Sequence, residues 1–243
     1  MSQPQPHLPA DPEARARRLA RLEAARLYVC TDARTDRNSP EDMRELEMFF
    51  HEAFAGGVDI IQLRDKSISA RDEIAAVRLL GAVAREHGGL FAVNDRADIA
   101  ALTNPDIFHG GQEDLCTADM RALLGPDVLL GRSNRSEEMF ADSLADGDID
   151  YAVIGPVWPT PTKPDRAAVG VPMVSRAAEM VAQRRQAGDT VNWWAIGGID
   201  IERAQQVRAA GAERIVVVRA VTEAKDPRAA ATALRAVFDE NLA

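Results

Sequence analysis

The sequence predicts an α/β fold, a single (β/α)8 TIM barrel that follows a short N-terminal leader and a lead-in helix. Eight short segments are almost continuously apolar, as parallel strands buried on both faces are, and amphipathic helical segments alternate with them. An open parallel sheet usually has about five or six strands, so eight βα units within roughly 215 residues favour closure into a barrel.

The apolar segments and the helical segments follow one another along the whole chain after residue 26. The predicted strands are Leu27–Thr31, Val58–Arg64, Leu90–Asn94, Asp106–His109, Val128–Gly131, Tyr151–Gly155, Trp193–Gly197 and Arg214–Val218. The predicted helices include Pro40–Ala55, Ala70–Glu86, Ser136–Ala145, Val174–Ala187, Ile201–Ala210 and Pro227–Asn241. Their apolar residues recur at helical spacing, and glycine after a helix allows the left-handed turn that leads into the next strand.

The first 25 residues precede the barrel. Met1–Asp11 is polar and rich in proline, which predicts a disordered leader without the apolar stretch of a secretory signal. Glu13–Arg26 has leucines at helical spacing and predicts the lead-in helix, whose arginines are more typical of a solvated face than of a site for an anionic partner. We therefore expect the leader and lead-in helix over residues 1–25 and one catalytic barrel domain over residues 26–243.

The composition excludes several classes of protein. A net charge of −9 and a pI near 5.0 argue against nucleic acid or an anionic membrane surface as a partner. No window approaches about 18 uninterrupted apolar residues, so no membrane span is expected. The two cysteines, Cys30 and Cys116, make no disulfide framework and fit a reducing cytoplasm.

Polar residues gather directly after six of the predicted strands. These strand ends form the catalytic face of a (β/α)8 barrel, so the six clusters are expected to lie together. Any one of these clusters, taken alone, could be an ordinary loop. In the cluster after the second strand, for example, Arg64 or Lys66 could simply pair with Asp65. The clusters are Gln62–Lys66, Asn94–Asp98, His109–Asp114, Gly131–Ser133, Gly155–Pro164 and Gly197–Ile199.

Asp95 and Asp114 follow adjacent strands and are the candidate metal ligands. Mg²⁺ usually takes one or two protein carboxylates and completes its shell with water and phosphate oxygens. Asp95 and Asp114 could provide the carboxylates. The alternative is that each carboxylate caps the helix that follows it. Asp98 is more typical of a first-turn residue than of a ligand.

Two further loops carry groups that suit an anion. Thr160–Pro164 combines two hydroxyls and the Lys163 ammonium with prolines that restrict its conformations. Gly197 and Gly198 expose backbone N–H groups before a helix, as in the phosphate site that many barrels build after their last strands.

The histidines and cysteines form no evident nucleophile or zinc constellation. His109 ends a strand without a triad partner in sight, and Cys30 reads as a core residue. A site rich in phosphate-binding groups and poor in general bases is typical of an enzyme that handles a pyrophosphate by electrostatics.

The motifs together resemble the thiamine-phosphate synthase family over about Arg26–Glu240. The resemblance rests on the segments Gln62–Lys66, Asn94–Arg96, Gly111–Asp114, Pro159–Lys163 and Ile196–Ile199. It implies a barrel transferase that joins 4-amino-2-methyl-5-(diphosphomethyl)pyrimidine to a thiazole phosphate, giving thiamine phosphate and pyrophosphate with Mg²⁺ as cofactor. These small molecules are then the partners, and the oligomeric state, monomer or homo-oligomer, stays open.

The resemblance also implies the roles of individual residues. Arg64, Lys66 and Lys163 would be catalytic through the leaving pyrophosphate, and Asp95 and Asp114 would bind Mg²⁺. The remaining implied substrate contacts are Gln62, Asn94 and Ser133 for the diphosphate substrate, and Thr160, Thr162, Gly198, Val218 and Arg219 for the thiazole phosphate.

The chain departs from the family pattern at three positions. Gly110 stands where the family usually has Leu, Arg135 where it usually has His, and Arg219 where it often has Ser. Arg219 could clamp the phosphate, or its side chain could turn to Glu223 while only its backbone N–H serves the phosphate, and we favour the second arrangement. The alternative functions are a thiazole tautomerase-like enzyme or a non-catalytic phosphate-binding barrel, and the complete set of pyrophosphate and metal residues argues against both.

Overall fold

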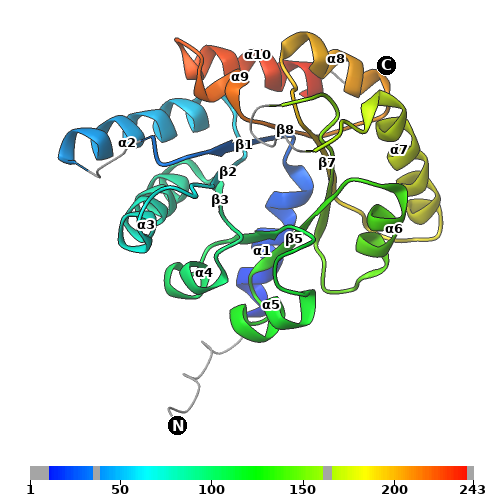
Figure 1. Cartoon of the computed structure of the whole chain (residues 1–243), viewed down its shortest axis with the longest axis horizontal. Coiled ribbons are helices and arrows are strands. Elements are labelled where there is room, and N and C mark those ends of the chain that lie inside the picture. The colour runs from blue at the N-terminus through cyan, green and yellow to red at the C-terminus, as the bar shows by residue number, and fades with distance from the viewer. Residues whose placement is uncertain (1–10, 35–38, 161–165, 240–243) are drawn as a thin grey trace.

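The computed structural model describes residues 11–34, 39–160 and 166–239. Within them, eight parallel strands form a closed barrel in which each strand pairs with its neighbours in chain order and β8 returns to pair with β1 (Figure 1). The predicted (β/α)8 barrel is therefore confirmed. Among these residues no helix combines the length and the apolar character that crossing a membrane would require.

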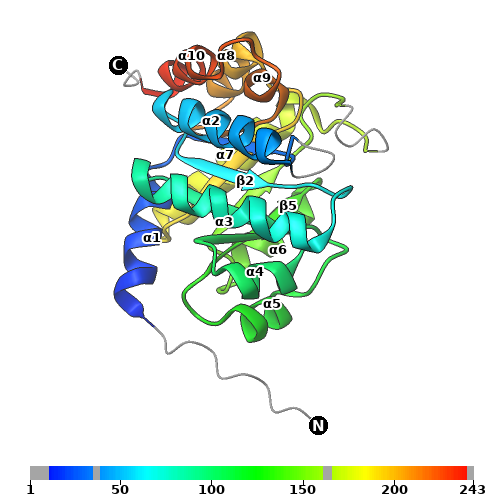
Figure 2. The same cartoon turned by 90° about the vertical axis from the view of Figure 1, so that its left-hand side faces the viewer.

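The elements lie close to their predicted positions. The strands are β1 Leu27–Thr31, β2 Ile60–Leu63, β3 Leu90–Asn94, β4 Ile107–Gly110, β5 Leu129–Asn134, β6 Tyr151–Ile154, β7 Trp193–Ile196 and β8 Ile215–Val217. The helices are α1 Pro12–Ala24, α2 Pro40–Ala55, α3 Ala70–His87, α4 Ala97–Thr103, α5 Thr117–Leu124, α6 Glu137–Ala145, α7 Gly170–Gln186, α8 Ile201–Ala209, α9 Arg219–Thr222 and α10 Pro227–Asp239. Figure 2 shows α2, α3, α4 and α5 in succession along one flank of the barrel.

β5 is the strand whose end differs most from the prediction. It continues past Gly131 to Asn134, because Ser133 and Asn134 pair with Val153 and Ile154 of β6. A polar side chain is compatible with a strand at this rim, since the strand ends open onto the site rather than into the apolar core. The extension carries Ser133 to the mouth of the barrel.

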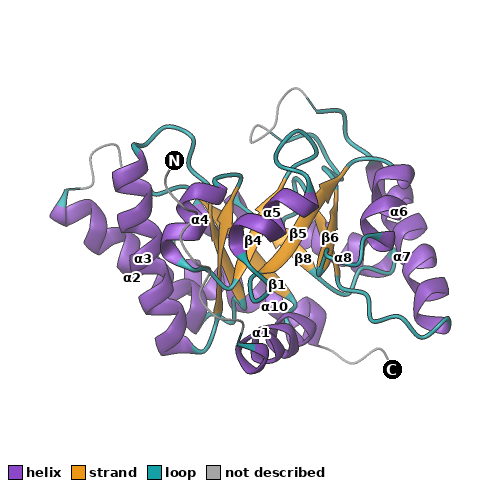
Figure 3. Ribbon diagram, turned by 90° about the horizontal axis from the view of Figure 1, so that it is seen from below, coloured by secondary structure: helices purple, strands orange, loops and turns teal. Residues whose placement is uncertain are grey.

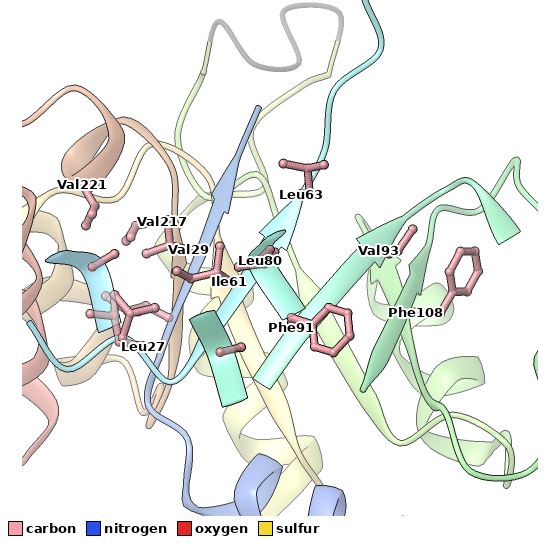
Figure 4. Packing of buried hydrophobic residues seen from close by; sticks show 14 of the residues in the cluster. Leu27, Val29, Ile61, Leu63, Leu80, Phe91, Val93, Phe108, Val217 and Val221 are labelled. Carbon is pink, nitrogen blue, oxygen red and sulfur yellow. The ribbon is translucent and has the colours of Figure 1, made fainter. Parts of the chain in front are cut away.

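The core has two layers because successive strand residues face opposite sides of the sheet. Outward-facing residues of the strands, such as Val29, Ile61 and Phe91, pack against the surrounding helices (Figure 4). Inward-facing residues, including Tyr28, Tyr151 and Trp194, fill the barrel and are at most 1% exposed. The interior is thus a packed core and not a channel.

Helix α1 covers the end of the barrel at which the strands begin (Figure 3). Its Leu22 is fully buried in the interior cluster. Arg15 pairs with Asp150 at 2.6 Å and Arg18 with Asp106 at 2.9 Å, and these two aspartates immediately precede β6 and β4. The prediction that the arginines of this helix form a solvated face was wrong for these two, since a sequence pattern does not show what a helix packs against.

Candidate active site

The two predicted metal ligands meet at the rim of the barrel where β3 and β4 end. The carboxyl groups of Asp95 and Asp114 are hydrogen-bonded to each other. Lys66 Nζ lies 3.0 Å from Asp95 Oδ2, and Asp114 Oδ2 also accepts the backbone N–H of Gly111 at 2.6 Å. Asp114 is 19 positions after Asp95, and Asp95 is 29 positions after Lys66, so the closed barrel brings the three side chains together.

The two carboxyl groups shift each other's pKa in opposite directions. Burial alone would raise the pKa of Asp95, but hydrogen bonds from Asp114 and Lys66, together with the positive charge of Arg64, outweigh it and lower that pKa. The pKa of Asp114 is raised, first by partial desolvation and then by its bond to Asp95. Two neighbouring carboxyl groups supply the oxygen ligands that a hard cation takes.

The alternative, in which these aspartates cap the following helices, was wrong. The residue that caps α4 is Arg96 and the one that caps α5 is Cys116, and neither cap involves a side-chain hydrogen bond. Asp98 lies in the first turn of α4 and pairs with Arg96 at 2.6 Å, as its spacing predicted.

Asp65 has a structural task in the loop after β2. It accepts hydrogen bonds from the backbone and hydroxyl of Ser67 at 2.8 and 2.6 Å, and from the backbone of Ala33 at 3.1 Å. Although burial opposes the effect, these bonds lower the pKa of Asp65. Asp65 thereby fixes the loop that carries Arg64 and Lys66. Lys66 contacts Asp95, and the alternative of a simple loop pair between Lys66 and Asp65 is not found.

A cavity of about 290 Å³ opens on the same rim of the barrel, at the ends of β5 to β8. Ser133, Thr160, Gly198, Val218 and Arg219, all predicted substrate contacts, contribute to its wall. Gly197 and Gly198 have φ angles of +108° and +68°, and a Cβ on either would overlap or crowd Pro156 or Trp158. Glycine is therefore required here for the chain to pass this closely.

Three arginines stand at the same cavity, and two of them were not predicted. Arg203 donates to the carbonyl of Gly198 at 2.7 Å and lies 5.2 Å from the centre of the Trp158 ring, so it holds the glycine turn. Arg166 and Arg219 line the cavity, and neither guanidinium has an ion pair within the described residues. One feature of the sequence could have identified Arg203. A cation in the first turn of a helix interacts unfavourably with the helix dipole, so its presence there indicates another role.

Arg219 does not make the contact that we favoured from sequence. It begins α9, and no ion pair joins it to Glu223 among the residues that the structure describes. It contributes to the wall of the cavity instead.

The site also contains a histidine whose role the sequence did not reveal. His109 Nε2 lies 2.8 Å from Ser133 Oγ, and His109 Nδ1 lies 2.9 Å from the hydroxyl of Tyr151. On the opposite side of the barrel, Gln62 donates to the hydroxyl of Tyr28 at 2.8 Å. The inward-facing positions of the strands carry these groups, and continuous apolar runs gave no sign of which positions face inward.

The remaining departures from the family pattern have local explanations. Gly110 ends β4, and the flexible side chain of Met120 fills the space where a Cβ would lie. Arg135 extends from the rim to Glu113, with 4.0 Å between Nη2 and Oε1. Neither change disturbs the contact between Asp95 and Asp114.

The other predicted site residues divide by location. Arg64 follows β2 beside Lys66, and Asn94 ends β3 next to Asp95 and is 7% exposed. Thr162 and Lys163 lie outside the described residues. No cluster of three or more carboxylate, imidazole or thiol groups suited to a metal occurs in residues 11–34, 39–160 and 166–239, so the carboxylate pair stands by itself.

A TIM barrel whose strand ends carry paired carboxylates, several cations and a glycine-lined cavity defines a phosphate-handling enzyme of the (β/α)8 class. Residues 27–221 match the family model described as thiamine monophosphate synthase. The chain belongs to this family, and the predicted fold, family and transferase class are confirmed.

Individual relatives agree with the family match. The chain is 52% identical over 215 residues to the thiamine-phosphate synthase of Thermobifida fusca (strain YX), covering 88% of this chain and 93% of that protein. It is 50% identical over 235 residues to the protein of the same name from Arthrobacter sp. (strain FB24), covering 90% and 97%. Among solved structures, the thiamine phosphate pyrophosphorylase from Pyrococcus furiosus superimposes with a TM-score of 0.75 and 29% identity, covering 92% of this chain and 100% of that one.

Proposed function

We propose that the chain condenses 4-amino-2-methyl-5-(diphosphomethyl)pyrimidine with a thiazole phosphate, releasing thiamine phosphate and pyrophosphate. The observation that carries this proposal is that the strand-end rim of one barrel holds both the Asp95–Asp114 pair with Lys66 and a cavity at the ends of β5 to β8. One half of the site suits a metal-bound diphosphate, and the other half suits a second, monophosphorylated substrate. An enzyme with a single phosphate substrate would need only the second half.

The carboxylate pair fits Mg²⁺. Asp95 and Asp114 interact with each other, and their oxygens are the hard ligands that Mg²⁺ prefers. When bound, Mg²⁺ would neutralise charge on the diphosphate leaving group.

The side chains then divide the reaction between them. Arg64 and Lys66 hold the diphosphate and stabilise the charge that grows on it as its bond to the pyrimidine methylene breaks, and we assign the same role to Lys163. Gln62, Asn94 and Ser133 position the pyrimidine diphosphate. The thiazole nitrogen captures the carbocation that remains, so no protein nucleophile is needed.

Most of the cavity would hold the second substrate, whereas Ser133 in its wall faces the pyrimidine diphosphate. The glycine turn at Gly198 and the segment Val218–Arg219 would take the thiazole phosphate, with Thr160 and Thr162 beside it. Arg203 keeps the turn in place through its bond to the Gly198 carbonyl. A rigid cavity of this kind limits the entropy lost when the two substrates are brought together.

The decisive experiment mixes both substrates with the purified protein and Mg²⁺ and measures thiamine phosphate and pyrophosphate. We expect equal amounts of both products, and none when either substrate is left out. A thiazole tautomerase would change the thiazole phosphate without the pyrimidine, and a non-catalytic phosphate-binding barrel would bind it without turnover. Neither cysteine is in a disulfide, and we propose that the enzyme works in the cytoplasm.

A further inference from the structure

A continuous chain of hydrogen bonds crosses the inside of the barrel and ends at the site. Gln62 Nε2 lies 2.8 Å from the Tyr28 hydroxyl, which lies 3.3 Å from the Tyr151 hydroxyl. Tyr151 lies 2.9 Å from His109 Nδ1, and His109 Nε2 lies 2.8 Å from Ser133 Oγ. The first four of these residues are at most 7% exposed, whereas Ser133 lines the cavity.

The direction of the chain follows from its first member. The Cys30 thiol donates to Gln62 Oε1 at 3.2 Å, which leaves the amide NH2 facing Tyr28. An amide nitrogen only donates, so the Tyr28 oxygen accepts this bond. The proton of Tyr28 then goes to Tyr151, and the proton of Tyr151 goes to His109 Nδ1.

The opposite direction would leave a buried donor without a partner. If Tyr151 donated to Tyr28 while Gln62 also donated to it, the Tyr28 proton would face no other acceptor among the described residues. A buried, unpaired hydroxyl proton is one of the costlier defects of a protein interior. Reversal would therefore require the Gln62 amide to turn over and give up its bond from the thiol.

Other features hold both phenols in their protonated, donating form. Burial, as the largest cause, raises the pKa of Tyr28 and that of Tyr151 well above the ordinary value. Gly131 leaves the room that the Tyr151 ring occupies, since a Cβ at this position would overlap the ring. The Gly131–Ser133 segment thus provides both the space for Tyr151 and the residue at the end of the chain.

We propose that this chain fixes His109 as the neutral tautomer protonated at Nε2, and so makes Ser133 a hydrogen-bond donor toward the diphosphate substrate. Because Nε2–H donates to Ser133 Oγ, Ser133 is the acceptor in this bond. Its own hydroxyl proton is therefore available to donate into the cavity. An anionic oxygen there accepts a bond from the hydroxyl but would be repelled by its lone pairs. Tyr151 is accordingly a positioning residue that acts through His109, and the role of Ser133 rests on the proposed function.

Nitrogen NMR of the uniformly labelled protein tests the direction without relying on activity. The chain has four histidines, and the signals of His109 are assigned as those lost in His109→Asn. We expect the wild type at neutral pH to show a protonated Nε2 and a bare Nδ1. Protonation at Nδ1 alone, or at both nitrogens, would overturn the proposal.

A double-mutant cycle tests whether Tyr151 works through Ser133. Losing one hydrogen bond of the chain should lower kcat/KM for the pyrimidine diphosphate about 3- to 30-fold in Tyr151→Phe. In a Ser133→Ala background the same substitution should change kcat/KM less than about twofold, because the proton that Tyr151 directs is absent. An equal loss in both backgrounds would show that Tyr151 acts independently of Ser133.

Tyr28→Phe tests whether the first members of the chain set its direction. It keeps the contact between Tyr151 and His109 but removes the hydroxyl that directs the Tyr151 proton, so His109 should show a mixture of the two neutral tautomers, and kcat/KM should fall less than in Tyr151→Phe. A single Nε2–H tautomer in Tyr28→Phe would show that the direction does not come from Gln62 and Tyr28. Circular dichroism and thermal unfolding establish that each variant is folded. If no thiamine phosphate forms at all, the proposed function fails, while the NMR result on the wild type still decides the tautomer.

Discussion

Asp95 shows how a single backbone conformation helps to build the site. Its φ of 56° lies in the left-handed region, which aspartate tolerates better than most residues with a side chain. The turn is held by hydrogen bonds from Asp95 N to His109 O at 3.0 Å and from Arg96 N to Asn94 O at 2.6 Å. This strained residue joins β3 to β4 at the point where its carboxyl group meets Asp114, so the strain lies at a functional position.

Replacing one carboxylate tests the metal assignment. Asp114→Asn should lower kcat by about 100-fold or more, because the leaving diphosphate loses an electrostatic partner, while the unfolding temperature stays close to that of the wild type. EDTA should abolish turnover of the wild type and added Mg²⁺ should restore it. Asp98→Asn is the control, since this exposed aspartate pairs with Arg96 only and should leave kcat unchanged. Full activity of the wild type in EDTA would contradict the assignment.

Arg219 allows a test of the second half of the site. Arg219 contributes to the cavity wall and has no ion pair in the described part of the chain, so its guanidinium is available to a phosphate, and Arg219→Ser should raise KM for the thiazole phosphate about tenfold. KM for the pyrimidine diphosphate serves as the internal control and should stay within about twofold. An unchanged KM for the thiazole phosphate would mean that only the backbone at this position serves the phosphate. Steady-state kinetics with each substrate varied in turn measures both constants.

At the scale of the element, helix α1 depends on arginines that reach the barrel floor. Arg18 is 14% exposed and donates to Asp106 at 2.9 Å and to the carbonyl of Asp127 at 3.0 Å. Arg18→Ala should lower the free energy of unfolding by about 1–3 kcal/mol, because it leaves a half-buried carboxylate without its partner. Arg17→Ala, on the same helix but 61% exposed, should change it by less than about 0.5 kcal/mol. Urea denaturation distinguishes the two, and equal effects would show that α1 is held by its leucines alone.

The same helix shows what the sequence could and could not predict. The bounds of β1 and β3 agree with the prediction because each apolar run stops at a polar residue, Thr31 or Asn94. The partner of Arg18 could not be predicted, since it is 88 residues away and only the closed fold brings it near. Local patterns encode the elements, whereas contacts between distant elements depend on how those elements pack.

The residues of the candidate site likewise divide into those that local sequence patterns predicted and those that depend on contacts between distant segments. Polar clusters after the strands identified the rim, and the rule that strand ends share one face of a barrel placed Asp95 beside Asp114. The inward-facing positions of Tyr28 and Tyr151 could not be predicted, because strands buried on both faces show no alternation that would separate inner from outer positions. Arg203 escaped notice because its partners, Gly198 and Trp158, are brought to it by two different loops.

At the scale of the whole molecule, one end of the barrel holds the candidate site and the other end holds contacts that stabilise the fold. The rim at the strand ends holds the predicted substrate residues, and the floor holds acidic residues that tie elements together. Asp59, Asp106 and Asp150 stand directly before β2, β4 and β6, and each accepts a backbone N–H of a neighbouring strand. Part of the net charge of −9 is therefore neutralised in the floor, away from the anionic substrates.

Asp59 tests whether stability and activity are separable in this way. It accepts the backbone N–H groups of Arg26 and Leu27 at 2.7 and 2.9 Å and pairs with Arg235 of α10 at 2.6 Å, so it joins the start of β1 to the last helix. Asp59→Ala leaves these donors unpaired at the seam where the barrel closes. It should therefore lower the free energy of unfolding by about 2–4 kcal/mol. At a temperature where the variant is folded, kcat should equal that of the wild type, because Asp59 lies at the opposite end from the site.

The control for Asp59→Ala is Asp239→Ala, which removes the other, exposed partner of Arg235. An exposed pair of this kind contributes little, so the change should stay below about 0.5 kcal/mol. Urea denaturation gives the stabilities, and the two-substrate assay gives kcat for each variant. If Asp59→Ala lowered kcat as strongly as it lowered stability, the floor would be coupled to the catalytic rim. Stability and activity would then be separable only through variants at the rim. Arg219→Ser is such a variant, and it should change KM while leaving the urea midpoint unchanged.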